Sequence, residues 1–284
     1  MIETSRDDRQ LQIRNIAGEV MRLAHDGILI NMRFLDVALS RLKVVCREQT
    51  GAHLFDGMML YYDPALLLVQ YKSAPHYAAR LYLHTLLHCI FYHGRNTDKL
   101  NRAYWDLATD IAVEHTIADM GLHLTKLPSD DLLQNRLELL HKQAGGLTAE
   151  KLYRHFRVEE PSKKAMEEWH KLCHYDEHIY WDRQEELDLS QAEWRRLSER
   201  IKADLKSFSK DRDNAESMEQ NLREATRERY DYTDFLRKFM VMGETVQVND
   251  DEFDYIYYTY GLQTYGNMPL VEPLEYQDSN KIRD

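Results

Sequence analysis

Two histidines four residues apart, His84 and His88 in the run LYLHTLLHCIFYH, form the sharpest chemical feature of the sequence. On an α-helix, positions i and i+4 differ by only about 40° of rotation, so both imidazoles point the same way and can bind one metal ion. Zinc peptidases use this spacing in the motif HExxH. The surrounding residues are apolar nearly all round, which predicts a buried helix. Two core histidines that hydrogen-bond to carbonyls or carboxylates are the alternative interpretation.

Three carboxylates follow on the next helix-length stretch, AYWDLATDIAVEHTIADMG. Asp106, Asp110 and Glu114 occupy successive i, i+4 positions and therefore share one helix face, spread over about 80°. A solvated acidic stripe is the usual explanation of such a pattern. Here the intervening residues are largely apolar, and one class of zinc enzymes completes a two-histidine site with a carboxylate from a later helix. We therefore predict Asp110 as the third metal ligand, with Asp106 as an alternate.

The position after the first histidine departs from HExxH, because Thr85 stands where the motif has glutamate. A threonine hydroxyl is far too weak a base to take a proton from zinc-bound water at neutral pH. Either another carboxylate acts as the base, with Glu114 the candidate catalytic residue and Asp106 the second choice, or the domain binds metal without peptidase chemistry. We favour the second interpretation.

Other histidines could support or extend this site. His93 comes nine residues after His84, so on a continuous helix it would point about 180° away, and we expect it in a loop or behind the ligands. The run CHYDEHIYWDR has His174 and His178 at i, i+4, which predicts either a second metal-binding pair or a contribution of His178 to the first site. A polar surface cluster or a structural hydrogen-bonding group is the alternative.

Composition limits the remaining classes of function. The 284 residues carry a net charge of −11, which disfavours binding to the phosphate backbone of nucleic acids. No stretch approaches the roughly 18 apolar residues of a membrane span, and the charged start MIETSRDDRQ does not resemble a signal peptide. The three cysteines are scattered without a CxxC pair, which fits a reducing compartment. These features predict a cytoplasmic protein that binds neither nucleic acid nor membranes.

The spacing of apolar residues predicts a mostly helical α+β fold, in which zincin-like core helices combine with a small sheet and long charged helices. We expect three regions: 1–160 as the metallopeptidase-like core with the HxxxH helix, 161–250 as a charged helical region packed on it, and 251–284 as aromatic strands and a linker. The linker would lead to a C-terminal domain that the chain lacks.

Individual elements can be placed within this scheme. The expected helices span about 8–24, 29–46, 76–93 and 102–120, with shorter helices after Ser129 and Thr148. Residues 58–62 form the expected strand, which Asp63-Pro64 ends. A stripe at helical spacing predicts packing against another helix, and its members are Trp194, Leu197, Ile201, Leu205 and Phe208.

The run from Asp56 to His115 resembles a bacterial family of metallopeptidase-like domains, through the pieces DGMMLYYDP, LHTLLHCIFYHGR and WDLATDIAVEH. The later DEHIYW is similar to a further element of that family. Such domains typically precede a von Willebrand factor A-like domain and are encoded near MoxR-type AAA ATPases. The resemblance implies that His84, His88 and Asp110 are metal positions, whereas the catalytic glutamate does not carry over. The chain has no D-x-S-x-S signature, so we expect the von Willebrand factor A-like domain in a longer protein.

These features together predict a metallopeptidase-like domain that binds one divalent ion, preferably zinc, through nitrogen and oxygen ligands. If the domain is catalytic, the expected reaction is metal-assisted hydrolysis of a peptide bond. The alternative is a non-catalytic interaction scaffold that works with a MoxR-type AAA ATPase. Its docking surface would be the charge-rich region from Pro161 to Phe239.

Overall fold

The computed structural model describes residues 2–57, 59–94, 100–179, 188–208, 216–226, 245–248 and 274–277. Contacts divide the chain into two compact units, Met1–Arg227 and Glu228–Asp284. The α-helices of the first unit are α1 (Ile2–Asn31), α2 (Asp36–Arg41), α3 (Pro64–Ser73), α4 (Tyr77–Phe91), α5 (Arg102–Met120), α6 (Asp130–Ala144), α7 (Ala149–Glu159), α8 (Lys163–Cys173), α9 (Asp188–Phe208) and α10 (Glu216–Ala225). The short 3-10 helices are η1 (Arg33–Leu35) and η2 (His123–Thr125), and the strands are β1 (Lys43–Cys46), β2 (Leu54–Phe55), β3 (Met59–Tyr62) and β4 (Glu177–His178).

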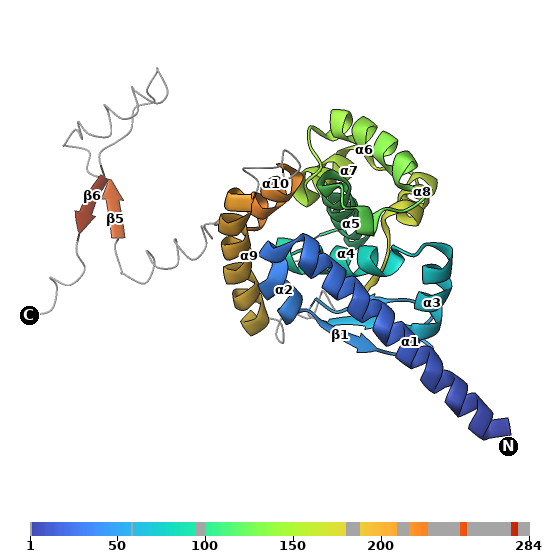
Figure 1. Cartoon of the computed structure of the whole chain (residues 1–284). Helices are drawn as coiled ribbons and strands as arrows, with labels where there is room; N and C mark the ends of the chain where they lie inside the picture. The colour runs from blue at the N-terminus through green and yellow to red at the C-terminus, as the bar shows by residue number, and fades with distance from the viewer. Residues whose placement is uncertain are drawn as a thin grey trace, which may run out of the picture. The chain divides into compact units, whose positions relative to one another are not determined.

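Helices α4 and α5 form the centre of the first unit. α1 packs along α4 and α3, α7 and α8 pack on α5, and α9 and α10 pack on α4 (Figure 1). Almost every residue of α4 is buried, as expected for a helix that is apolar nearly all round. The predicted class, a mostly helical α+β fold with a small sheet, is confirmed.

The four-stranded sheet of this unit has the order β1-β3-β2-β4. β1 runs parallel to β3, β2 runs antiparallel to β3, and β4 runs parallel to β2. β4 is held by two backbone hydrogen bonds, from Glu177 N to His53 O and from Ile179 N to Phe55 O, both 2.8 Å long. This pairing sets His178 opposite Phe55, and so brings a late segment of the chain next to α4.

The two helices predicted near the N-terminus, over 8–24 and 29–46, both have the wrong bounds. α1 spans Ile2–Asn31 and so extends beyond both predicted ends. Gly27 lies within this helix, at a position where an added Cβ would meet no neighbouring atom. The stretch predicted as a helix over 29–46 is instead divided among the end of α1, η1, α2 and β1. β1 contains two adjacent valines and pairs with β3, so tertiary pairing overrides the helical spacing there.

The ends of the two central helices matter for the site. α5 covers the predicted range, starts from the Asn101 side chain, which accepts a hydrogen bond from Tyr104 N, and ends at Gly121 with φ 61°. α4 ends at Phe91, earlier than predicted, because Tyr92 adopts the left-handed conformation with φ 67°. The helix therefore ends two residues before the predicted end at residue 93.

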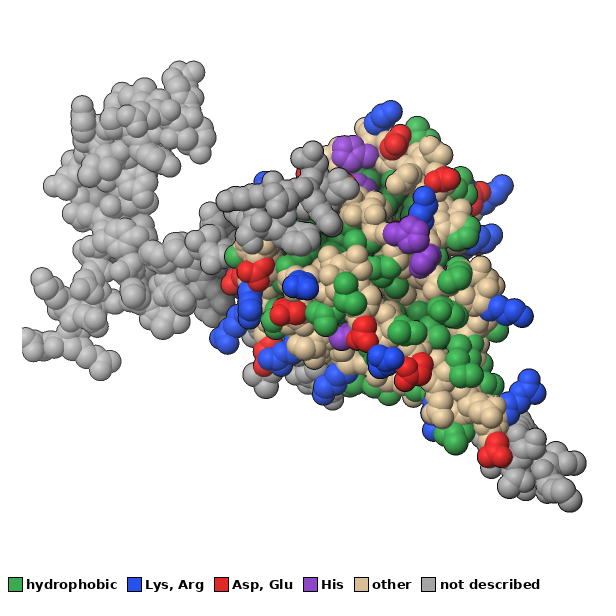
Figure 2. All heavy atoms as spheres, viewed as in Figure 1, with side chains coloured by type: hydrophobic (Ala, Val, Ile, Leu, Met, Phe, Trp, Pro, Cys, Tyr) green, Lys and Arg blue, Asp and Glu red, His purple; other side chains and the backbone are tan. Residues whose placement is uncertain are grey.

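The stripe on α9 behaves as predicted over its described side chains. Trp194, Leu197, Ile201 and Leu205 are buried, and α9 packs on α4 and α10. Figure 2 shows that acidic and basic side chains are interspersed on the visible face of the described residues. No helix among the described residues is both long and apolar enough to cross a membrane.

The second unit contains β5 (Thr245–Val248) and β6 (Leu274–Gln277), which pair antiparallel with Val246 opposite Tyr276. The sequence predicts aromatic strands between 251 and 284. Its tyrosine-rich part, 255–265, lies outside the described residues, so that prediction stays open. β6 is a strand within the predicted region.

Candidate metal centre

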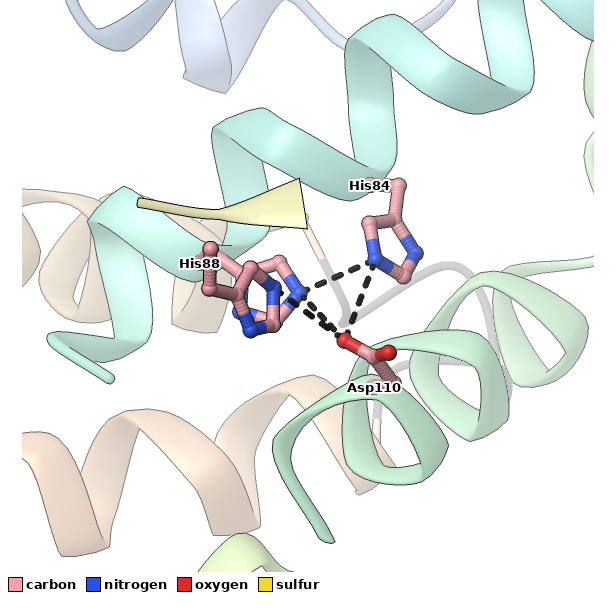
Figure 3. Close-up of side chains that lie close together, drawn as sticks. His84, His88 and Asp110 are labelled. Atoms are coloured by element: carbon pink, nitrogen blue, oxygen red, sulfur yellow. Dashed lines mark hydrogen bonds and ion pairs between the residues drawn. The ribbon is translucent and has the colours of Figure 1, made fainter. Parts of the chain in front are cut away.

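Four side chains from three elements converge beside α4. His84 and His88 lie on α4, Asp110 lies on α5 and His178 lies on β4. One possible ligand atom from each of them lies within 4.8 Å of the others, and all four residues are buried. Figure 3 shows both α4 histidines directed toward Asp110. The structure thus brings together the three predicted ligands and His178, one of the two alternates.

The spacing of these atoms is close to that of zinc ligands. Asp110 Oδ1 lies 3.6 Å from His84 Nε2, 3.4 Å from His88 Nε2 and 3.3 Å from His178 Nε2. Ligands at about 2.0–2.1 Å from a tetrahedral zinc ion lie about 3.3–3.4 Å apart. The two α4 Nε2 atoms are only 2.9 Å apart, so an ion between them would require that pair to open by a few tenths of an ångström.

The surroundings of Asp110 Oδ1 indicate whether the site fits a metal ion. Asp110 Oδ1 is buried and accepts no hydrogen bond from any of the described residues. A buried carboxylate oxygen without a partner is strongly unfavourable, and this one faces the Nε2 atoms of three histidines. A cation bound among these atoms would satisfy the oxygen, and three imidazoles with one carboxylate are a donor set that zinc accepts.

Each of the two α4 histidines is held through its Nδ1 atom, on the side of the ring that faces away from the centre. His84 Nδ1 lies 2.7 Å from Glu114 Oε1, and His88 Nδ1 lies 3.1 Å from His93 Nδ1. Because these contacts use Nδ1, they leave Nε2 of each ring directed at the centre. Metal-binding histidines are commonly fixed in this way through the ring nitrogen that does not bind the metal.

His178 and Asp110 also have neighbours on the side that faces away from the centre. His178 Nδ1 lies 3.5 Å from Asp106 Oδ1. Asp110 Oδ2 lies 3.1 Å from His174 Nδ1, while its Oδ1 faces the centre. Asp110 is therefore held like the α4 histidines, whereas the contact of His178 with Asp106 Oδ1 is longer and is not a hydrogen bond.

Charge is distributed unevenly among these groups. Burial alone would lower the pKa of His84, but its interactions with Asp110 and Glu114 raise it to about 10. Burial lowers the pKa of His88 well below its usual range. Burial opposes ionisation of Asp110, yet the surrounding histidines keep the pKa of its carboxyl well below its usual range. His84 therefore holds a proton at neutral pH that a metal ion would have to displace.

Comparison with protein families shows where this chain belongs. Residues 22–241 match the model of a family described as "Putative metallopeptidase domain", and the match covers most of the chain. The chain belongs to this family. No curated protein and no solved structure matches the chain. The family resemblance expected from the sequence is confirmed, and the candidate centre lies inside the matched range.

Glu114, the candidate base of this metallopeptidase-family domain, is not placed for that role. Its Oε1 contacts His84 Nδ1, and its Oε2 accepts hydrogen bonds from Arg80 Nε at 2.8 Å and Arg80 Nη2 at 2.6 Å. Both oxygens are therefore engaged, on the side of His84 that faces away from the centre. The geometry assigns Glu114 to orienting His84.

Asp106, the alternate for ligand and base, lies at the edge of the cluster and outside the four converging side chains. Its Oδ2 accepts a hydrogen bond from Arg102 Nε at 2.9 Å, and its Oδ1 faces His178 Nδ1. Asp106 is therefore in a position to orient His178. His178 had been predicted only as an alternate ligand.

His93 lies behind the ligands, as expected. The chain turns at Tyr92, so that His93 N donates to His88 O at 3.2 Å and the His93 ring returns to His88. Trp105 Nε1 donates to His93 O at 2.9 Å and fixes the turn. Burial lowers the pKa of His93 to about 3, so its ring is neutral and can exchange a hydrogen bond with His88.

Asp176 also faces the centre, although the sequence pattern only grouped it with His174 and His178 and gave it no role there. Its Oδ1 lies 3.5 Å from His84 Nε2, and its side chain is completely buried. The available signal was the period of a strand: residues two apart point to the same side, so Asp176 and His178 can both face α4. That signal is weak by itself, because β4 covers only Glu177–His178.

Proposed function

We propose that this domain binds one divalent metal ion, zinc by preference, through His84, His88, His178 and Asp110. The observation that carries the proposal is the convergence of three Nε2 atoms on the otherwise unpartnered Asp110 Oδ1. Nickel, cobalt and iron accept similar ligands. Membership of a metallopeptidase family supports a metal at this position.

When bound, zinc would act as a Lewis acid that polarises a water molecule or a carbonyl group. The protein's own contribution is to fix the ligands. α4 supplies two imidazoles, α5 supplies the anionic oxygen, and the pairing of β4 with β2 supplies the third imidazole. Hydrolysis of a peptide bond is the reaction that family membership favours.

A non-catalytic scaffold remains the second candidate, and one observation favours it. Thr85 occupies the glutamate position of the HExxH pattern, and this residue of α4 is completely buried. In this case the ion would tie α4, α5 and β4 together without chemistry, as structural zinc sites with four protein ligands do. The MoxR-type AAA ATPase, the von Willebrand factor A-like domain and the cytoplasmic location stay predictions.

Metal analysis of the purified protein tests the proposal. We expect one zinc per chain after equilibration with zinc and dialysis. We expect almost none in His84→Ala/His88→Ala, and weakened binding in His178→Ala. His141→Ala, which removes an exposed histidine from α6, is the matched control and should retain one zinc. Substoichiometric zinc in the wild type, unaffected by the double substitution, would disprove the metal site.

A further inference from the structure

Thr85 stands at the glutamate position of the HExxH pattern. This residue follows His84 on α4 and is completely buried. Its Oγ1 lies 3.1 Å from the Leu81 carbonyl and 3.4 Å from Asp176 Oδ2. The side chain at the glutamate position thus contacts a carboxylate that comes from a different part of the chain.

The second oxygen of that carboxylate is directed at the metal centre. Asp176 Oδ1 lies 3.5 Å from His84 Nε2, the nitrogen that faces the other ligands. It is buried and accepts no hydrogen bond from any of the described residues. Since a buried carboxylate oxygen without a hydrogen-bond donor is unfavourable, a donor bound at the metal would satisfy Asp176 Oδ1.

The net charge of the buried site is an independent reason to expect a carboxylate at position 176. A divalent ion with neutral His84, His88 and His178 and with ionised Asp110 leaves a net charge of one positive unit in a buried site. Glu114 does not compensate for it, because its charge is matched by Arg80 at 2.6 Å. The side chain of Asp176 is 0% exposed, and its carboxylate makes the buried group neutral, as burial requires.

We propose that Asp176 is the catalytic carboxylate of this centre and takes the place of the glutamate that Thr85 replaces. This inference rests on the proposed metal site. In peptide hydrolysis, Asp176 Oδ1 would accept a proton from the attacking water while the water oxygen bonds to the carbonyl carbon. The carbon–nitrogen bond then breaks, and Oδ1 returns the proton to the leaving nitrogen. One water is consumed, and no other reactant is needed.

The test uses the full chain loaded with cobalt, whose visible spectrum reports the ligands, and acetohydroxamic acid as a probe. The probe binds a metal through its oxygens and donates a hydrogen bond to an adjacent carboxylate. The variants are Asp176→Asn, Thr85→Glu/Asp176→Asn and, as a matched control, Asp131→Asn at an exposed position of α6. Equilibrium dialysis measures bound cobalt, and the cobalt spectrum measures the Kd of the probe.

We expect every variant to bind one cobalt per chain, with a weaker affinity in Asp176→Asn because that variant leaves one positive unit in the buried site. In Asp176→Asn the Kd of the probe should rise about tenfold to a hundredfold, the loss of one charge-assisted hydrogen bond. Thr85→Glu/Asp176→Asn should recover much of that loss, because it returns a carboxylate from position 85. Asp131→Asn should match the wild type.

Three results would overturn the assignment of Asp176 while leaving the metal site in place. A loss of cobalt in Asp176→Asn would make Asp176 a ligand or a structural residue. An unchanged Kd of the probe would show that Asp176 does not reach a molecule bound at the metal. Failure of the cobalt-loaded wild type to bind the probe would show that the four protein ligands leave no position for water, which rules out a catalytic Asp176. A wild type that binds no cobalt would instead disprove the metal site itself, and the assignment of Asp176 with it.

Discussion

At the scale of single residues, the centre is built from pairs in which an outer group orients an inner one. Glu114 is the clearest case, because its two oxygens connect the ring of His84 to the guanidinium of Arg80. Arg80 and Glu114 are almost completely buried, so each needs the other. Glu114 therefore serves both the fold and the orientation of a candidate ligand.

Replacing Glu114 by Gln is expected to lower the free energy of unfolding of the metal-free protein by about 3 kcal/mol. The reason is that Arg80 would stay buried without its closest carboxylate, although Asp130 Oδ1 remains 3.4 Å away. Chemical denaturation measures the change. Glu19→Gln, which breaks an exposed pair with Arg22, should change it by less than about 1 kcal/mol. Equal effects of the two substitutions would contradict the prediction.

At the scale of elements, the centre joins a helix pair to a sheet. α4 and α5 supply three of the candidate ligands, and β4 supplies the fourth through only two residues paired to β2. So short a strand has few interactions of its own. A bound metal would therefore stabilise the contact of β4 with α4 more than it stabilises α4 itself.

Removing the metal is expected to lower the melting temperature by about 5–10 °C, the loss of a ligand that was present at roughly a hundred times its Kd. Differential scanning calorimetry with and without EDTA measures the shift. Hydrogen exchange should rise most around β4. In His84→Ala/His88→Ala, EDTA should have no effect. A similar EDTA shift in that variant would show that the chelator acts elsewhere.

Asp63 illustrates how one side chain positions several elements. Its Oδ1 accepts hydrogen bonds from Ala65 N and Leu66 N at the start of α3, and its Oδ2 accepts from Thr50 N and Gly51 N. Burial raises the pKa of this carboxyl, but the four backbone donors outweigh burial and lower it. Asp63 therefore ties the β1–β2 loop to α3, the helix that precedes α4.

Asp63→Asn should lower the free energy of unfolding by about 2 kcal/mol at pH 7, since its amide nitrogen cannot accept the bonds from two backbone groups. The contribution of a lowered carboxyl pKa is full above the unfolded value, about pH 4, and is lost as the pH falls through the folded value. Denaturation at several pH values should therefore show the difference from wild type shrinking below about pH 4. A difference independent of pH would contradict this account, and Asp131→Asn should show none.

At the scale of the whole molecule, the chain forms two compact units that meet in sequence at Arg227 and Glu228. Every candidate ligand, and every partner that orients one, lies within the first unit. The net charge of −11 describes the chain as a whole. Most of the acids at the centre are buried: Asp110, Glu114 and Asp176.

A chain that ends at Arg227 is expected to bind one zinc with the affinity of the full chain, because it retains all the groups described at the centre. Equilibrium dialysis against zinc, with His84→Ala/His88→Ala in both lengths as the control, measures the comparison. Loss of zinc in the shorter chain, if its helical circular dichroism were retained, would show that residues beyond 227 contribute to the site.

Local spacing was enough to predict the two central helices and three of the four converging residues. His84 and His88, and Asp110 on the next helix, are set by a repeat of about four residues, which depends only on helix geometry. The caps at Asn101 and Gly121 are equally local. Tyr92 could not be predicted as the end of α4, because a left-handed tyrosine is stabilised by packing and not by its own preference.

The sequence by itself determined that a buried histidine pair would face one way and that a carboxylate could meet it from the following helix. Only the tertiary structure decided that His178 joins them, that Glu114 turns toward Arg80, and that Asp176 lies beside Thr85. The physical reason is the range of the interactions. Helix periodicity acts over four residues, whereas the position of β4 depends on its pairing with Leu54 and Phe55, far earlier in the chain.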